Sequence, residues 1–127
     1  MPPTSGTPCH ILVVEDDPAI MMMIQLLLEM RGYSSTAVAD GEAAINYLRE
    51  ADALPSLILL DLQMPGMDGK GFLAIRQATP EWQAIPVILL SATQEITAVQ
   101  LQLDVQASIR KPFDPESMLN LVERFCS

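Results

Sequence analysis

The sequence predicts an α/β domain with a doubly wound, five-stranded parallel sheet. Short apolar runs alternate with longer helical stretches along the 127 residues, which is the pattern of repeated strand–helix units. The apolar runs are continuous rather than alternating, as in strands that are buried on both faces. The length fits one domain, and right-handed crossovers place helices on both faces of such a sheet.

Each of the five expected strands is a short run that ends at polar or turn-forming residues. The strands are expected at Ile11 to Val14, Ser35 to Ala39, Leu57 to Leu60, Pro86 to Leu90 and Ser108 to Arg110. The second and the fifth runs are weaker strand signals than the other three, because they contain fewer large apolar residues.

Five helices are expected to follow these strands, and local signals mark their ends. The helices are expected at Pro18 to Arg31, Glu42 to Arg49, Gly69 to Ala78, Glu95 to Leu103 and Pro115 to Phe125. Asp17 and Asp114 each precede a proline and act as N-caps, and Gly32 ends the first helix. A loop rich in Pro and Gly, Pro65 to Gly69, precedes the third helix.

The composition excludes several classes of protein. Half of the residues are hydrophobic, which excludes global disorder, and the net charge of −9 argues against direct binding to nucleic acid or to an anionic membrane. No apolar run reaches the roughly 18 residues of a membrane span, and the N-terminus has no signal-peptide pattern. We therefore expect a cytoplasmic protein with a mobile tail at residues 1–8 and one domain at residues 9–127.

The two cysteines, Cys9 and Cys126, lie near opposite ends of the chain and lack metal-ligand spacing. We expect two reduced thiols, as is usual in a cytosolic protein, and a disulfide is the less favoured alternative. The lone His10 has no cysteine or second histidine near it, so no role as a ligand or catalyst is expected.

Reactive side chains follow four of the five expected strands. Parallel strands present their carboxyl ends at one edge of the sheet, where ligands bind in folds of this class. The residues expected to meet there are Glu15, Asp16, Asp17, Asp61, Ser91 and Lys111. Each feature alone is weak, since acidic loops are common, but their joint position at strand ends is specific.

The chemistry of this edge follows from its charges. Several carboxylates within a few ångströms repel one another unless a cation lies between them, and an all-oxygen site selects a hard ion such as Mg²⁺. A lysine and a hydroxyl can each hold a phosphoryl oxygen. A carboxylate between these groups is a candidate nucleophile toward phosphorus, with an acyl phosphate as the product.

Four segments carry a family resemblance that covers about Cys9 to Phe125. These segments are Ile11 to Pro18, Leu57 to Gly69, Val87 to Ala92 and Lys111 to Phe113. They resemble the receiver domain of two-component response regulators, the family of the chemotaxis regulator CheY. The resemblance implies a flavodoxin-like fold with strand order 2-1-3-4-5.

The resemblance also implies a phosphorylation and metal site. Asp61 would be the phosphoacceptor, and Asp16 and Asp61 would bind Mg²⁺ directly. Glu15 would act on the ion mainly through water, and the backbone carbonyl of Gln63 would be a further ligand. Lys111 would contact a phosphoryl oxygen.

The family's partners and switching follow from the same resemblance. The phosphoryl group would come from a histidine kinase or a histidine phosphotransfer protein, and Ser91 would be the switch hydroxyl. Such a receiver is a regulatory phosphoacceptor rather than an enzyme, with only self-catalysed phosphorylation and dephosphorylation. It would be a monomer or a weak dimer that acts on an unidentified downstream protein.

The sequence departs from the family pattern in one region. The family has an aromatic residue three positions before the lysine, where this chain has Ser108, and a glycine seven positions before it, where this chain has Asp104. Residues 91–111 are also about two residues short. We expect an altered fourth helix, and we hypothesise that Asp61 is phosphorylated but that no aromatic flip relays the signal.

The first expected helix is unusually apolar, and its methionines can be interpreted in two ways. Helical spacing places Met21 and Met22 on the same face as Gln25 and Glu29. Ordinary burial or scattered exposure is the plainer interpretation. The functional interpretation is a methionine-rich docking surface for a kinase or phosphotransfer helix.

Two other functions compete with a phosphorylatable receiver. A pseudo-receiver would be a protein-interaction module that has lost Asp16, Asp61, Ser91 or Lys111, and all four are present. A phosphohydrolase of the haloacid dehalogenase type would carry a second aspartate two residues after the nucleophile, where this chain has Gln63. The chain also lacks room for a cap domain.

Overall fold

The computed structural model describes residues 9–62, 69–91, 106–111 and 113–126. Five strands form one parallel sheet in the order β2-β1-β3-β4-β5, which confirms the predicted doubly wound fold. The strands are β1 (His10–Val14), β2 (Ser34–Val38), β3 (Leu57–Asp61), β4 (Val87–Ser91) and β5 (Ala107–Arg110). The expected tail at residues 1–8 and the expected helix at residues 95–103 lie outside the described residues.

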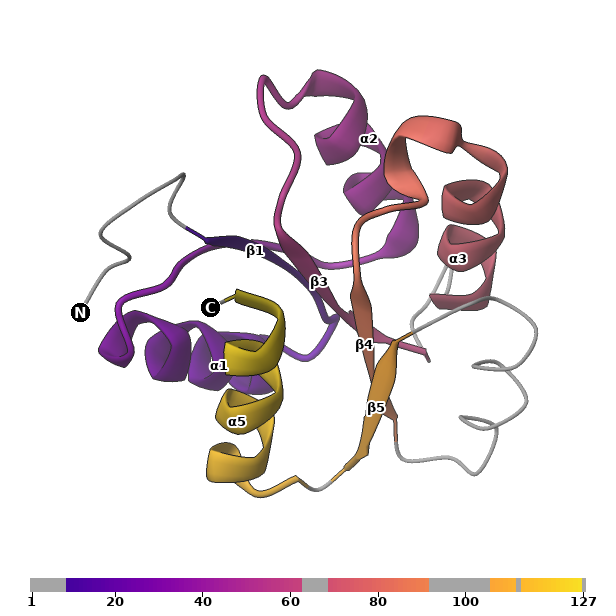
Figure 1. Cartoon of the computed structure of the whole chain (residues 1–127). Coiled ribbons are helices and arrows are strands. Elements are labelled where there is room, and N and C mark those ends of the chain that lie inside the picture. Colours follow the sequence, from indigo (N-terminus) through magenta and orange to yellow (C-terminus); the bar gives the residue numbers. More distant parts are fainter. Residues whose placement is uncertain (1–8, 63–68, 92–105, 112, 127) are drawn as a thin grey trace.

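The described helices cover both faces of the sheet. They are α1 (Pro18–Met30), α2 (Gly41–Glu50), α3 (Gly69–Ala78) and α5 (Pro115–Cys126), with a 3₁₀ helix, η1 (Pro80–Trp82), after α3. Figure 1 shows α1 and α5 together on one face and α2 and α3 on the other. The strands are therefore covered on both sides, which is why their sequences are continuous apolar runs.

Two hydrophobic layers hold these helices to the sheet, and successive residues of β1 alternate between them. Leu12 and Val14 pack with α2 and α3, whereas Ile11 and Val13 pack with α1 and α5. All four of these β1 side chains are fully buried. The alternation fixes the strand register, because a slip of one residue would exchange the two layers.

The helix ends follow the predicted signals. The carboxylate of Asp17 accepts hydrogen bonds from the backbone N–H groups of Ala19 and Ile20, at 2.9 and 3.3 Å, so it caps α1. Gly32 follows α1 with a φ of 84°, a left-handed conformation that glycine adopts without a steric penalty.

The cysteines correct one expectation from the sequence. Cys9 and Cys126 form a disulfide, although the sequence favoured two reduced thiols. Helices that follow parallel strands run back toward the amino ends of those strands, so α5 ends where β1 begins. The Cα atoms of the two cysteines are 5.6 Å apart, within the span of about 4.4–6.8 Å that a disulfide bridges.

Arg76 is a buried cation near the same end of the sheet, although sequence patterns assigned it no role. Its side chain is 1% exposed. Its Nη2 donates to the carbonyl oxygens of Ile85 and Gln83 at 2.7 and 3.0 Å, and its Nε donates to Ile85 at 3.2 Å. These bonds attach α3 to the segment that leads into β4.

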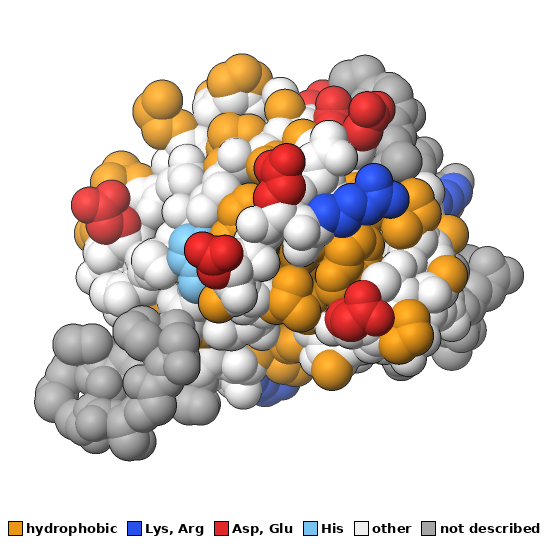
Figure 2. All heavy atoms as spheres, turned by 90° about the horizontal axis from the view of Figure 1, so that it is seen from above, with side chains coloured by type: hydrophobic (Ala, Val, Ile, Leu, Met, Phe, Trp, Pro, Cys, Tyr) orange, Lys and Arg blue, Asp and Glu red, His pale blue; other side chains and the backbone are white. Residues whose placement is uncertain are grey.

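The acidic side chains on one face of the domain are dispersed (Figure 2). On the face drawn in Figure 2, acidic side chains are spread over the surface among neutral and hydrophobic ones rather than gathered into one patch. Within the described parts of the chain, no helix has the length and apolarity needed to cross a membrane.

Candidate functional site

The acidic site lies where β1 and β3 end. Glu15 and Asp16 follow the last residue of β1, and Asp61 is the last residue of β3. These strands are neighbours in the sheet, with Val14 paired to Leu60. Their register therefore brings the three carboxylates to one edge, as the sequence predicted.

The three carboxylates are close enough to share one ion. One oxygen from each lies within 4.8 Å of the other two, and this is the one such cluster of metal-binding residue types in the described residues. Glu15 is fully buried and Asp61 is 5% exposed, whereas Asp16 is the most exposed of the three. Burial strengthens their mutual repulsion, so the arrangement requires a compensating cation.

Lys111 provides part of that compensation. It follows β5, and its Nζ lies 2.5 Å from Oε1 of Glu15 and 3.5 Å from Oδ2 of Asp61. Its side chain is 16% exposed, so solvent screens these contacts only weakly. The sequence placed Lys111 at this edge, but its shorter contact with Glu15 was not foreseen.

The site has a net negative charge that a divalent cation would neutralise. The three carboxylates carry three formal negative charges, and Lys111 returns one. The two charges that remain match those of Mg²⁺, which prefers carboxylate oxygens. The donor set therefore fits this ion.

Asp17 does not join the cluster, although it adjoins Asp16. Its carboxylate caps α1, as described above, and its backbone N–H donates to Oε2 of Glu15 at 3.1 Å. Glu15 is thus held at both oxygens, by Lys111 and by the start of α1. Asp17 is thus the N-cap that the sequence predicted, and its carboxylate is not one of the three in the cluster.

Gly69 packs against the backbone of Asp61 and Leu62 at the end of β3. The sequence identified it only as the start of a helix. Its backbone N–H donates to the carbonyl oxygen of Leu62 at 3.0 Å. A Cβ at this position would lie 2.5 Å from the carbonyl oxygen of Asp61 and 2.7 Å from the Cα of Leu62. Only glycine lets α3 begin this close to the end of β3, and the Pro- and Gly-rich loop was the available signal.

The structure describes some of the remaining predicted site residues and not others. Ser91 ends β4, and its backbone pairs in register with Arg110 of β5. Gln63 and Asp104 lie outside the described residues. Ser108 is half-buried in β5.

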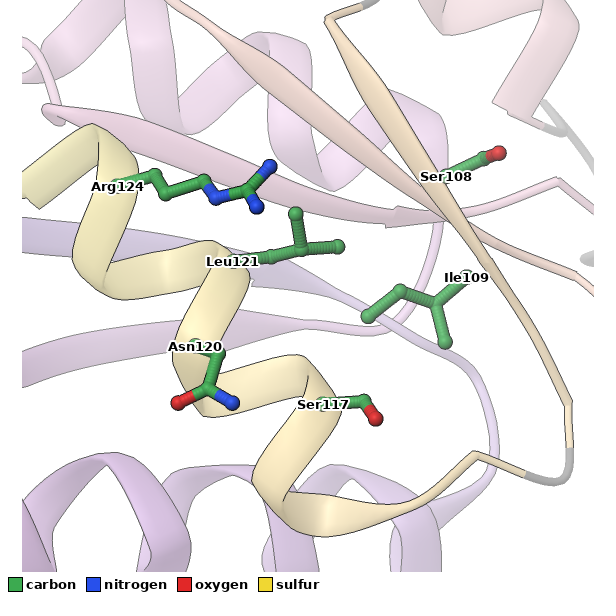
Figure 3. A pocket seen from close by; sticks show the side chains of 6 residues that line it. All are labelled: Ser108, Ile109, Ser117, Asn120, Leu121 and Arg124. Carbon is green, nitrogen blue, oxygen red and sulfur yellow. The ribbon is translucent and has the colours of Figure 1, made fainter.

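A hollow of about 360 Å³ lies between β5 and α5. Its lining residues are Ser108, Ile109, Ser117, Asn120, Leu121 and Arg124. In Figure 3, Ile109 and Leu121 point toward each other, while the hydroxyl of Ser108 points away from α5. An open hollow therefore lies beside the position where the family carries its aromatic residue.

Helix α1 exposes several large apolar side chains. Met22 is 71% exposed and Met30 is 75% exposed, with Leu26 at 56% between them. Met21 is half-buried. Of the two methionines that helical spacing placed on the polar face, Met22 is therefore exposed and Met21 is only partly so.

Comparisons with known proteins agree with this geometry. The profile of the response regulator receiver domain matches residues 11–123. The DNA-binding response regulator MtrA of Mycolicibacterium smegmatis is 33% identical over 112 residues, which is 87% of this chain and 47% of that protein. The chain thus spans about half the length of the curated relatives it matches.

Two solved structures have the same fold. The receiver domain of a signal transduction histidine kinase from Syntrophus aciditrophicus superposes with a TM-score of 0.84 at 30% identity, over 93% of this chain and 89% of that one. The receiver domain of a sensor histidine kinase from Pseudomonas aeruginosa superposes with a TM-score of 0.82 at 27% identity, over 94% and 98%. That structure has a magnesium ion coordinated in its active site cleft.

Proposed function

Because the chain belongs to the family of response regulator receiver domains, we propose that it accepts a phosphoryl group on Asp61 and changes its affinity for a partner protein. The donor is a histidine kinase or a histidine phosphotransfer protein. One observation carries the proposal: a buried aspartate lies close to two further carboxylates and to the ammonium group of Lys111. Such domains are regulatory rather than classical enzymes.

Asp61 acts as the nucleophile in this proposal. A carboxylate oxygen forms a bond to phosphorus as the phosphorus–nitrogen bond of the donor phosphohistidine breaks, and the imidazole keeps the electron pair and takes up a proton. The Nζ of Lys111, 3.5 Å from Oδ2 of Asp61, binds a phosphoryl oxygen. Water later attacks the acyl phosphate and restores the carboxylate.

Asp16 and Asp61 hold Mg²⁺ directly in this proposal, Glu15 through water, and the backbone carbonyl of Gln63 as a further ligand. Bound there, the ion stabilises negative charge on the oxygens of the transferring group. The pairing of Glu15 with both Lys111 and the backbone of Asp17 supports its secondary role, because both of its oxygens already have partners.

Switching is proposed to begin at Ser91, whose hydroxyl moves toward the phosphoryl group. Ser108 stands where an aromatic would respond, so the signal leaves this region without an aromatic flip. NMR spectra of the free and beryllofluoride-bound forms test this step. Large shifts centred on Ser108 would contradict it, whereas shifts confined to the surroundings of Asp61 and Ser91 are expected.

The exposed apolar face of α1 is the proposed contact for the phosphodonor protein. Its residues Met22, Leu26 and Met30 lie on the helix that begins beside the acidic site. Methionine side chains adapt to different partner surfaces, which suits transient docking. We also propose that the protein is cytoplasmic, that it is a monomer or a weak dimer, and that it does not itself bind nucleic acid.

A phosphorylation assay tests the proposed function. Intact mass after incubation with acetyl phosphate and Mg²⁺ is expected to rise by one phosphoryl group, and Asp61→Ala is expected to abolish the gain. Asp52→Ala, an exposed aspartate, is the matched control and is expected to keep it. A wild-type chain without an adduct would indicate a pseudo-receiver, and multiple turnover on unrelated phosphate esters would indicate a hydrolase.

A further inference from the structure

Cys9 and Cys126 join two elements that are distant in sequence. Cys9 immediately precedes β1, and Cys126 is the last residue of α5, 117 positions later. Both belong to the hydrophobic layer that also contains Val122 and Phe125 of α5. The disulfide therefore ties the last turn of α5 to the central part of the sheet.

The two cysteines differ in their exposure to solvent. Cys9 is 7% exposed and is covered by the hydrophobic layer. Cys126 is half-buried at the helix end. A soluble thiol or disulfide can therefore approach Cys126, while Cys9 is positioned to react only with its partner.

Other ties between α5 and the rest of the domain are weak at its ends. Near its start, the guanidinium of Arg31 contacts the carboxylate of Glu116 at 2.7 Å, but both side chains are largely exposed. Exposed ion pairs of this kind contribute little stability. At the other end, the disulfide and the packing of Phe125 hold the last turn.

We propose that Cys9 and Cys126 form a reversible redox clasp that fixes the last turn of α5 against β1. Oxidation closes the clasp and holds the helix on the sheet. Reduction leaves two neighbouring thiols and lets the last turn open. A disulfide with one partly exposed cysteine, which a soluble dithiol can reach, is the kind that serves regulation in a reducing compartment.

The covalent chemistry is thiol–disulfide exchange with a low-molecular-weight disulfide. The thiolate of Cys126 attacks one sulfur of that molecule, forms a mixed disulfide and releases one thiolate. The thiolate of Cys9 then attacks the Cys126 sulfur and releases the second thiolate. The two cysteine protons pass to the two released thiolates, so the small disulfide is reduced as the protein dithiol is oxidised.

The clasp is expected to affect the hollow between β5 and α5 as well as the stability of the domain. Four of the six residues that line the hollow in Figure 3 belong to α5, namely Ser117, Asn120, Leu121 and Arg124. Movement of the helix end displaces Arg124, which lies two residues before Cys126. The phosphorylation site lies at the opposite end of the strands, so its chemistry is independent of the clasp.

Redox titration of the wild-type protein tests the proposal. The chain is equilibrated in buffers that range from reduced to oxidised glutathione, unfolded in acid and labelled with a thiol-alkylating reagent. We expect no label at the oxidising end, two labels at the reducing end, and a single transition between them. Two labels under all conditions would overturn the bond, and no label under all conditions would overturn its reversibility.

Thermal unfolding and hydrogen exchange test what the clasp does. Reduction is expected to lower the Tm of the wild type by about 10 °C, since it frees a loop of 117 residues in the unfolded chain. It is also expected to speed exchange in the last turn of α5. The Cys9→Ser, Cys126→Ser double variant is expected to have the reduced Tm in both buffers.

Unchanged exchange in α5 on reduction of the wild type would overturn the clasp, even if the variant fails to fold. Labelling of Asp61 by acetyl phosphate is expected at equal rates in both redox states. Loss of labelling in both states would contradict the proposed function and leave the clasp supported. A rate that depends on redox state would contradict the independence of the two ends.

Discussion

Two largely buried cations stand at different ends of the sheet and have different partners. Arg76 lies near the amino end of β4, and its planar guanidinium donates to the carbonyl oxygens of Gln83 and Ile85. Lys111 lies at the carboxyl ends of the strands, and its ammonium contacts the carboxylates of Glu15 and Asp61. Both side chains are shielded from solvent, but only Lys111 is among groups that change their charge in the proposed reaction.

The difference shows how one fold separates support from chemistry. The carbonyl oxygens of Gln83 and Ile85 have fixed positions, and the planar guanidinium of Arg76 holds its N–H donors in a rigid arrangement that fits them. An ammonium group on a flexible stem can move between acceptors, so Lys111 can pass from Glu15 to a phosphoryl oxygen. Arg76 therefore stabilises the structure, whereas Lys111 can exchange one acceptor for another.

The largest expected effect comes from removing Arg76. Arg76→Ala leaves the carbonyl oxygens of Gln83 and Ile85 without these donors, and we expect a loss of about 3 kcal/mol in the free energy of unfolding by urea. Arg49→Ala on the exposed surface of α2 is the control and is expected to change it by less than about 0.5 kcal/mol. Equal effects of the two variants would contradict the structural role of Arg76.

Removal of Lys111 is expected to affect chemistry more than stability. Lys111→Gln is expected to slow labelling by acetyl phosphate about 100-fold, because a phosphoryl oxygen loses its charged partner. The rate of mass increase measures this, with Arg49→Gln as the charge-matched control. A rate within a factor of two of the wild type would exclude Lys111 from the reaction.

Substitutions at Gly69 and Gly32 compare a steric clash at the site with the loss of a positive φ elsewhere. Gly69→Ala is expected to cost about 2 kcal/mol in unfolding free energy and to slow labelling, because its Cβ would meet the backbone of Asp61 and Leu62. Gly32→Ala has open space but a positive φ, so about 1 kcal/mol and unchanged labelling are expected. Normal labelling of Gly69→Ala would show that the site tolerates a methyl group.

Neutralising Asp61 is expected to stabilise the metal-free protein. Asp61→Asn removes one of three repelling carboxylates while Glu15 keeps its contact with Lys111, so the unfolding free energy without Mg²⁺ is expected to rise by about 1 kcal/mol. Addition of Mg²⁺ is expected to raise the Tm of the wild type but not that of this variant. Asp52→Asn is the control, and a fall in stability for Asp61→Asn would contradict the repulsion.

The smallest expected effect concerns docking on α1. Met22→Gln is expected to leave the unfolding free energy within about 0.5 kcal/mol, since the side chain is mostly exposed. Phosphotransfer from a partner protein is expected to slow by about threefold to tenfold, with labelling by acetyl phosphate unchanged. Leu54→Gln, exposed on another surface, is the control, and equal slowing with both donors would contradict docking.

Much of the fold and of the site follows from local sequence. The apolar runs predicted the strands, and Asp17 and Gly32 predicted the ends of α1. The convergence of Glu15, Asp61 and Lys111 followed from the rule that parallel strands end at one edge. These features depend on residues within one or two elements.

Features that depend on how distant elements meet were missed. The bond between Cys9 and Cys126 depends on α5 ending beside β1, which spacing alone does not express. The burial of Arg76 depends on the path of η1. The contact of Lys111 with Glu15 joins residues that follow β5 and β1, two strands that β3 and β4 separate in the sheet.

The bridge between the chain ends has a mechanical consequence. Tension applied outside Cys9 and Cys126 passes through the sulfur–sulfur bond, across Cα atoms 5.6 Å apart. Once that bond is reduced, the same pull acts on β1 and α5 and can draw out the chain between the two cysteines, whose sequence separation of 117 corresponds to about 400 Å when extended. The thiol state of two cysteines therefore decides whether the domain transmits force as a short rigid link or yields as a long elastic one.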